Sequence, residues 1–167
     1  MPLIKDGAVV DDLWLTVADG EPLPDGVPVI VSASRWQAER DALSQRQGSL
    51  GVRLRADEPA ATLGADARHL ELIAIEFPSF RDGRGYSTAR LLRERYAFRG
   101  ELRAVGDVLR DQLLFMHRCG FDAFVIESVD AVQHWMAALS EISVVYQVAA
   151  DRRVPATRLR QMRRAAE

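Results

Sequence analysis

The stretch between residues 77 and 90 carries the side chains with the clearest chemical potential. It reads FPSFRDGRGYSTAR and holds two glycines, three arginines, one aspartate and several hydroxyls, between an apolar run and a helical pattern. Guanidinium groups bind planar or tetrahedral oxyanions such as carboxylate, phosphate and sulfate. A helix that begins after such a turn adds backbone N–H donors. These residues therefore predict an anion-binding turn between a strand and a helix.

The loop at Asp107 is expected to lie beside this turn, because loops that follow parallel strands meet at one edge of the sheet. We expect Arg81 or Arg84 to clamp the anion, and Asp82 or Asp107 to orient it. A purely structural interpretation is equally open: an Asx turn at Asp82, a helix cap at Ser87, and an ion pair between Arg84 and Asp107. The predicted ligand-binding site consists of Arg81, Asp82, Gly83, Arg84, Gly85, Tyr86, Ser87 and Asp107.

The sequence contains no recognised cofactor or metal motif. A dinucleotide fingerprint would need a third glycine where Thr88 stands, and no Walker lysine follows Gly85. The three histidines are isolated, without metal-ligand spacing. The one cysteine, Cys119, lies near an expected helix end and so lacks the N-terminal dipole that lowers a thiol pKa. We predict no cofactor and no metal, and the catalytic residues remain unknown.

Composition sets the protein class. A chain of 167 residues with 48% hydrophobic and 28% charged side chains is typical of one soluble globular domain. The sequence has no run long enough to cross a bilayer and no secretory leader pattern, so we expect a cytoplasmic location and no membrane contact.

Charge is unevenly distributed along the chain. The formal net charge is −2, yet residues 151–167 hold six arginines against two acids. We expect residues 1–150 to form a single α/β domain and residues 151–167 to be an Arg-rich C-terminal extension. A solvated end or docking onto an acidic partner protein both fit this extension. Nucleic acid is not expected as a partner, because the rest of the chain is acidic and the extension has no aromatic stacking residues.

Strand and helix signals alternate along the chain. Apolar, β-rich runs predict strands at 27–33, 50–54, 70–77, 102–105 and 123–126, with a further run at 144–148. Helical patterns lie between them, with Ser34, Ser87 and Asp130 as expected N-caps. Gly48, Gly100 and Gly120 are expected to end helices in the left-handed conformation.

This alternation predicts an α/β fold, a mostly parallel sheet with helices on both faces. A full (β/α) barrel needs about 250 residues, so an open sheet or an incomplete barrel is favoured. Residues 3–17 predict an N-terminal hairpin around Lys5-Asp6-Gly7, at a sheet edge or in a dimer contact.

The run from Phe77 through Phe124, FPSFRDGRGYSTARLLRERYAFRGELRAVGDVLRDQLLFMHRCGFDAF, resembles the bacterial domain-of-unknown-function family 934. The similarity spans most of the chain. The resemblance implies a role in sulfur assimilation, because members are typically encoded beside sulfite reductase and other assimilatory sulfate-reduction genes. Some members are labelled oxidoreductases. The family has no established catalytic residues, so the resemblance transfers none.

Two classes of function fit these observations. The first is an accessory protein of assimilatory sulfate or sulfite reduction, which binds a reductase or electron-donor partner and a small oxyanion. The second is a small enzyme, such as an oxidoreductase, that acts on an anionic metabolite at the strand-end pocket. The expected partners are sulfite reductase or another sulfur-assimilation protein, a small anion and a second copy in a homodimer.

Overall fold

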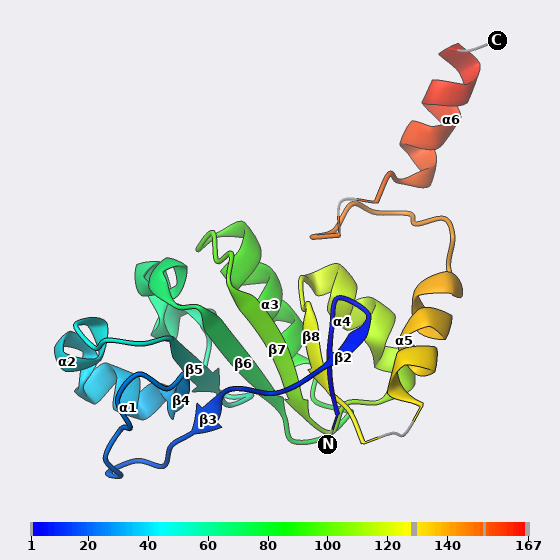
Figure 1. Ribbon diagram of the computed structural model, residues 1–167. Helices are drawn as coiled ribbons and strands as arrows, with labels where there is room; N and C mark the ends of the chain where they lie inside the picture. The colour runs from blue at the N-terminus through cyan, green and yellow to red at the C-terminus, as the bar shows by residue number, and fades with distance from the viewer. Residues whose placement is uncertain (1, 128–129, 152, 166–167) are drawn as a thin grey trace.

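The structure, a computed structural model, describes residues 2–127, 130–151 and 153–165. One eight-stranded sheet with the order β2-β1-β8-β7-β6-β5-β4-β3 forms its centre (Figure 1). The strands are β1 (Leu3–Lys5), β2 (Ala8–Val10), β3 (Leu15–Thr16), β4 (Val29–Ser32), β5 (Leu50–Leu54), β6 (Leu72–Phe77), β7 (Glu101–Gly106) and β8 (Ala123–Val125). The helices are α1 (Ala33–Ala38), α2 (Arg40–Ser44), α3 (Arg84–Glu94), α4 (Leu113–Cys119), α5 (Ala131–Ser140) and α6 (Ala156–Ala165). Three short 3₁₀ helices are η1 (Ala60–Thr62), η2 (Gly64–His69) and η3 (Arg110–Gln112).

The parallel part of the sheet follows the order of the chain. Strands β3 to β8 pair in parallel, each with the next. The hairpin of β1 and β2 joins antiparallel, with Leu3 opposite Val125 of β8. Its turn places Asp6 and Gly7 at φ of 49° and 85°, the left-handed pair that a tight hairpin needs. The predicted mostly parallel α/β sheet, open and barrel-like with an N-terminal hairpin, is confirmed.

The helices that pack on the sheet lie on one of its faces. Side chains of β6 alternate: Ile73 and Ile75 enter the main core, whereas Leu72 and Ala74 face the other way. Helices α1 to α5 all contribute side chains to the main core. The sequence placed helices on both faces; the structure differs because strands in chain order, joined by crossovers of one hand, return every helix to the same side.

An extended N-terminal segment covers part of the opposite face. We call residues 11–28 the strap; Trp14 of the strap packs on Leu72 and Ala74. This arrangement explains why β6 is apolar on both faces, since a strand covered by a helix layer and by a chain segment buries both sets of side chains.

Two helix starts differ from expectation, and one helix end agrees with it. Ser32, not Ser34, caps α1, because its Oγ accepts the N–H of Arg35 at 3.0 Å. Helix α3 starts at Arg84 with Gly83 as its N-cap, so the expected cap at Ser87 is wrong. Gly120 has φ of 106° and ends α4 as expected.

Gly100 does not adopt the left-handed conformation that we expected. A Cβ at this position would lie 2.4 Å from the carbonyl oxygen of Glu71, so close backbone approach is what requires glycine here.

The C-terminal end leaves the body of the molecule. The run at 144–148 forms no strand; Val145 makes only an isolated bridge with Pro155. Helix α6 buries none of its described side chains and stands clear of the sheet (Figure 1). The division into a domain of 1–150 and an extension stays a prediction. Within the described ranges, no helix combines the length and apolarity that crossing a bilayer requires.

Candidate functional site

The predicted turn after β6 is fixed by the residues that follow β7. Asp107 accepts a hydrogen bond from the backbone N–H of Phe80 at 2.9 Å, and its own N–H donates to the carbonyl of Phe77 at 2.8 Å. The side-chain amide of Gln112 donates to the carbonyl of Phe80 at 3.0 Å. The structure thus brings Asp107 to the turn, as predicted, where it binds the backbone of the turn.

Arg84 pairs within its own turn. Its Nη2 lies 2.6 Å from Oδ2 of Asp82, and its Nε lies 2.9 Å from Oδ1. These hydrogen bonds lower the pKa of the Asp82 carboxyl to about 2. The guanidinium of Arg81 lies 5.4 Å from the centre of the Phe80 ring. The Arg84 fork is therefore occupied by Asp82, and the ion pair with Asp107 that the structural interpretation allowed is not formed.

The other members of the predicted site have packing positions. Gly85 is buried, and a Cβ there would lie 2.6 Å from Cζ of Phe77. Tyr86 packs edge-to-face on Phe77 with ring centres 5.5 Å apart, and burial raises the pKa of its hydroxyl. Ser87 is exposed in α3, past its first turn. Anion binding at this turn stays a prediction.

A cavity of about 330 Å³ lies at the carboxyl ends of β3, β4, β5 and β6. Open α/β folds and barrels bind ligands at this end of their strands. Its wall includes the polar side chains of Asp19, Ser32, Ser34, Arg53, Arg55 and Glu76. This cavity lies at the same sheet edge as the predicted turn, on neighbouring strands.

One wall of the cavity is a cluster of two serines and an aspartate. Ser32 Oγ donates to Asp19 at 2.6 Å, and Ser34 Oγ donates to the other carboxylate oxygen at 3.2 Å. The two hydroxyl oxygens are 2.8 Å apart. Ser32 Oγ also caps α1, so the cluster links Asp19 of the strap to the first helix.

The other wall is charged. Arg53 Nη2 lies 3.0 Å from Glu76, and Arg55 Nε lies 3.4 Å from Asp57 and 3.7 Å from Glu58. The Arg53 and Arg55 side chains are 41% and 66% exposed, so both keep N–H donors that solvent or a ligand can reach. Two guanidinium groups beside two serine hydroxyls suit a small oxyanion, while the carboxylates would orient any cationic group of the same ligand.

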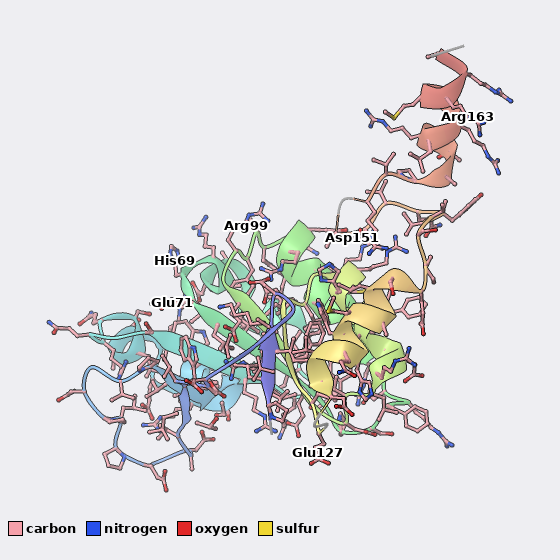
Figure 2. All side chains as sticks on the ribbon, turned by 45° about the vertical axis from the view of Figure 1, so that its right-hand side comes forward. His69, Glu71, Arg99, Glu127, Asp151 and Arg163 are labelled. Carbon is pink, nitrogen blue, oxygen red and sulfur yellow. The ribbon has the colours of Figure 1, made fainter. Side chains whose placement is uncertain are left out.

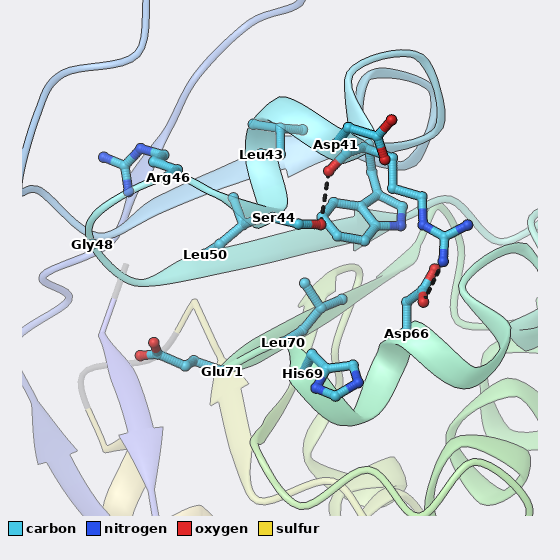
Figure 3. Close-up of a pocket in the computed structure, with 12 residues that line it drawn as sticks. Asp41, Leu43, Ser44, Arg46, Gly48, Leu50, Asp66, His69, Leu70 and Glu71 are labelled. Carbon is cyan, nitrogen blue, oxygen red and sulfur yellow. Dashed lines mark hydrogen bonds and ion pairs between the residues drawn. The ribbon is translucent and has the colours of Figure 1, made fainter.

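The largest of the described hollows, about 640 Å³, lies at the amino ends of β5 and β6 (Figure 3). Three of its charged groups have structural partners: Asp66 pairs with Arg40 at 2.6 Å, and Arg46 donates to the carbonyl of Val27 at 2.8 Å. These contacts hold the strap and η2 against α2. We therefore take the carboxyl-edge cavity as the candidate site.

His117 and Cys119 have packing positions. His117 packs edge-to-face on Trp135 with ring centres 5.3 Å apart. Burial raises the pKa of the Cys119 thiol, which keeps it protonated and unreactive. Among the described residues, no group of His, Cys, Asp or Glu side chains could hold a metal ion.

The cavity was not predicted from the sequence, because ligand-binding loops were sought only after the strand predicted at 70–77 and the strands that follow it. The strand-end rule applied to the strands ending near Ser32 and Leu54 would have pointed to Ser34, Arg53 and Arg55. The contribution of Asp19 was not predictable, because it depends on the strap pairing beside β4.

The model of one family, described as "Bacterial protein of unknown function (DUF934)", matches residues 51–157 of the chain. The matched segment contains β5 to β8, α3 to α5 and the predicted turn. No curated protein matches the chain.

Proposed function

Because the chain belongs to the DUF934 family of bacterial proteins, we propose that it is a cytoplasmic accessory protein of assimilatory sulfate or sulfite reduction. In this proposal it binds a small oxyanion and a reductase or electron-donor protein. The gene context of the family, stated above as an implication of resemblance, supports the pathway. The cavity with Arg53 and Arg55 at the carboxyl edge of the sheet supports the ligand class.

The arrangement of donors is the observation that carries the proposal. Arg53 lies in β5 and Arg55 directly follows this strand, so the two are two positions apart. Ser32 and Ser34 line the same cavity. A tetrahedral or pyramidal oxyanion accepts hydrogen bonds at several oxygens, so it can contact a guanidinium and a hydroxyl together. Both arginines are partly exposed, which favours reversible binding of a small, well-hydrated ion.

Isothermal titration calorimetry with sulfite, sulfate and phosphate tests the ligand class. We expect Arg53→Gln and Arg55→Gln each to weaken binding by about tenfold, as loss of one charge-assisted hydrogen bond predicts. Arg68→Gln, at an exposed position outside the cavity, is the matched control and should bind as the native chain does. Absence of heat with all three anions would refute the ligand class.

Deletion of the gene tests the pathway independently of the cavity. Growth of the deletion strain on sulfide but not on sulfite would place the protein at the reductase step, and unimpaired growth on sulfate would contradict the proposal. Co-purification of sulfite reductase with the tagged full chain tests the partner. The matched comparison is a chain that lacks residues 156–167.

The alternative, a small enzyme acting on an anionic metabolite, is favoured by one contact. Ser32 Oγ lies 2.6 Å from the Asp19 carboxylate inside the cavity, a distance at which a carboxylate can orient and polarise a hydroxyl. Conversion of a small anionic metabolite by the purified chain, followed by mass spectrometry, would support this class. The activity must then be lost in Ser32→Ala and kept in Arg68→Gln.

A further inference from the structure

Exposed apolar side chains are concentrated in the C-terminal arm, which we define as residues 142–151 and 153–165. Of the sixteen large apolar side chains that are exposed in the described part of the chain, seven belong to this arm. They include Tyr146 at 78%, Val148 at 61% and Met162 at 59% exposure. Apolar surface gathered in this way marks an interaction site.

Helix α6 of the arm is held to the described chain at its start, where the backbone N–H of Ala156 donates to the carbonyl of Val145 at 2.8 Å. It buries no described side chain, and both views show it standing away from the body (Figures 1 and 2). Ten-residue helices are marginal in water without packing, so a stable α6 needs a surface to lie on. Leu159 and Met162, three positions apart, present an apolar side for such a contact.

The base of the arm is held firmly on the body. Arg118 pairs with Asp151 at 3.2 Å, and the backbone N–H of Ala150 donates to the Arg118 carbonyl at 3.0 Å. Arg153 donates to the carbonyl of Leu139 in α5 at 3.2 Å. The arm therefore presents α6 from an anchored position, which lowers the entropy cost of docking it.

The charges of α6 are basic throughout. It carries four arginines and no acidic residue. Arg158, Arg160 and Arg164 make no ion pair with any residue in the described ranges. A partner surface for α6 must therefore be acidic as well as partly apolar.

The strap of the same molecule has this complementary chemistry. Residues 11–28 contain five acids and no basic residue. Asp11, Glu21 and Asp25 are exposed, and within the described chain they have no ion-pair partner. Leu13 and Leu15 stand 73% and 48% exposed among them. The strap includes β3 at one edge of the sheet, whereas the arm leaves from α5 on the far side (Figure 1).

We propose that two copies of this chain pair reciprocally, with α6 of each copy lying against the strap of the other. One chain supplies both halves of the contact, so a two-fold arrangement satisfies both arms at once. Thr16 and Asp19 of the strap also line the carboxyl-edge cavity. The docked α6 of the second copy therefore lies next to that cavity and adds positive charge near it.

Sedimentation velocity on the full chain tests the pairing. We expect a dimer at low salt that weakens markedly at about 1 M salt, where the Debye length falls to ~3 Å. The variant Arg158→Glu/Arg160→Glu/Arg164→Glu should dimerise about a hundredfold more weakly, because six ion pairs become repulsive contacts. The variant Arg68→Glu/Arg95→Glu/Arg99→Glu changes net charge equally outside the arm and should dimerise as the native chain does.

Charge reversal on both sides separates this pairing from a general charge effect. The strap variant Asp11→Lys/Glu21→Lys/Asp25→Lys should also lose its dimer. An equimolar mixture of the arm variant and the strap variant should form a heterodimer. In it, the acidic arm of the first variant meets the basic strap of the second, and the basic arm of the second meets the acidic strap of the first. A native chain that stays monomeric at low salt, or a mixture that forms no heterodimer, overturns the proposal.

Discussion

Arg103 and Asp12 form an ion pair across the open face of the sheet, with Nη1 of Arg103 2.7 Å from Oδ2 of Asp12. Arg103 also binds Glu101 through Nε at 2.7 Å, and Lys5 binds the second oxygen of Glu101 at 2.8 Å. These ion pairs hold the strap and β1 against β7 in the middle of the sheet. The strap covers this face of the sheet in place of a helix layer.

Glu101 should contribute more to stability than Asp12 does. The Glu101 side chain is 8% exposed and lies between two cations, so Glu101→Gln leaves the buried Arg103 without a charged partner inside the sheet. We expect it to lower the free energy of unfolding by about 3 kcal/mol. Asp12 is 41% exposed, and Asp12→Asn should cost about 1 kcal/mol. Urea unfolding measures both, and equal losses would contradict this ranking.

Asp82 should titrate near pH 2 and report on its turn. Because the pKa is lowered in the folded chain, the stabilising effect is present above the unfolded value of 3.8 and is lost as the pH falls toward about 2. In Arg84→Ala the carboxyl should titrate near its ordinary value, as followed by carbon NMR of the side chain.

The same titration tests the anion site predicted at this turn. An oxyanion that binds Arg84 must displace the Asp82 carboxylate, so saturating sulfate should raise the Asp82 pKa. If sulfate leaves this titration unchanged while it binds elsewhere on the protein, the turn is a structural element. Arg53→Gln serves as the comparison, because it removes one guanidinium group of the cavity and leaves the turn intact.

The two glycines of the turn should respond differently to alanine. Gly85→Ala places a Cβ 2.6 Å from Phe77 in the core, and we expect a loss of about 1–3 kcal/mol from overpacking. At Gly83 the nearest atom, on Tyr86, is 4.0 Å away, and φ is −85°. Gly83→Ala should therefore change stability by less than about 1 kcal/mol. Thermal unfolding of the two variants side by side provides the measurement.

Ser32 and Ser34 should differ in the same way. Ser32→Ala removes the cap of α1 and the shorter bond to Asp19, and should cost about 1–2 kcal/mol. Ser34→Ala removes the 3.2 Å bond to Asp19 and the 2.8 Å contact with Ser32 at an exposed position, and should cost less than about 0.5 kcal/mol. Chemical denaturation with unchanged m-values would validate the comparison, and a larger loss in Ser34→Ala would contradict the capping role.

The strands were predictable because their apolar runs are continuous. The run at 70–77 became β6 within two residues of its predicted start, and the turn Asp6-Gly7 formed the expected hairpin. The face on which the helices lie was not predictable, because a run that is apolar on both sides does not reveal what covers each side. The strap is a loop in its sequence pattern and a covering segment only in three dimensions.

The sheet edge of the candidate cavity could be predicted from the sequence, but its contacts could not. The strand-end rule pointed to the edge at which this cavity lies. Arg84, however, found its partner two positions away at Asp82, since the geometry of the turn favours the local pair. The cavity depends on contacts such as Ser32 with Asp19 and Arg53 with Glu76, which only strand order brings together.

The pairing of β1 with β8 has a consequence for synthesis of the chain. Leu3 lies opposite Val125, so the first strand can join the sheet only after the last strand has left the ribosome. At ~5–20 residues per second, translation of the intervening chain takes roughly 6–24 s. Throughout that time Leu3 and Ile4, which are 4% and 0% exposed in the finished molecule, have no place to bury. The nascent N-terminus thus exposes an apolar segment until β8 is available to pair with it, and chaperones can bind this segment during that time.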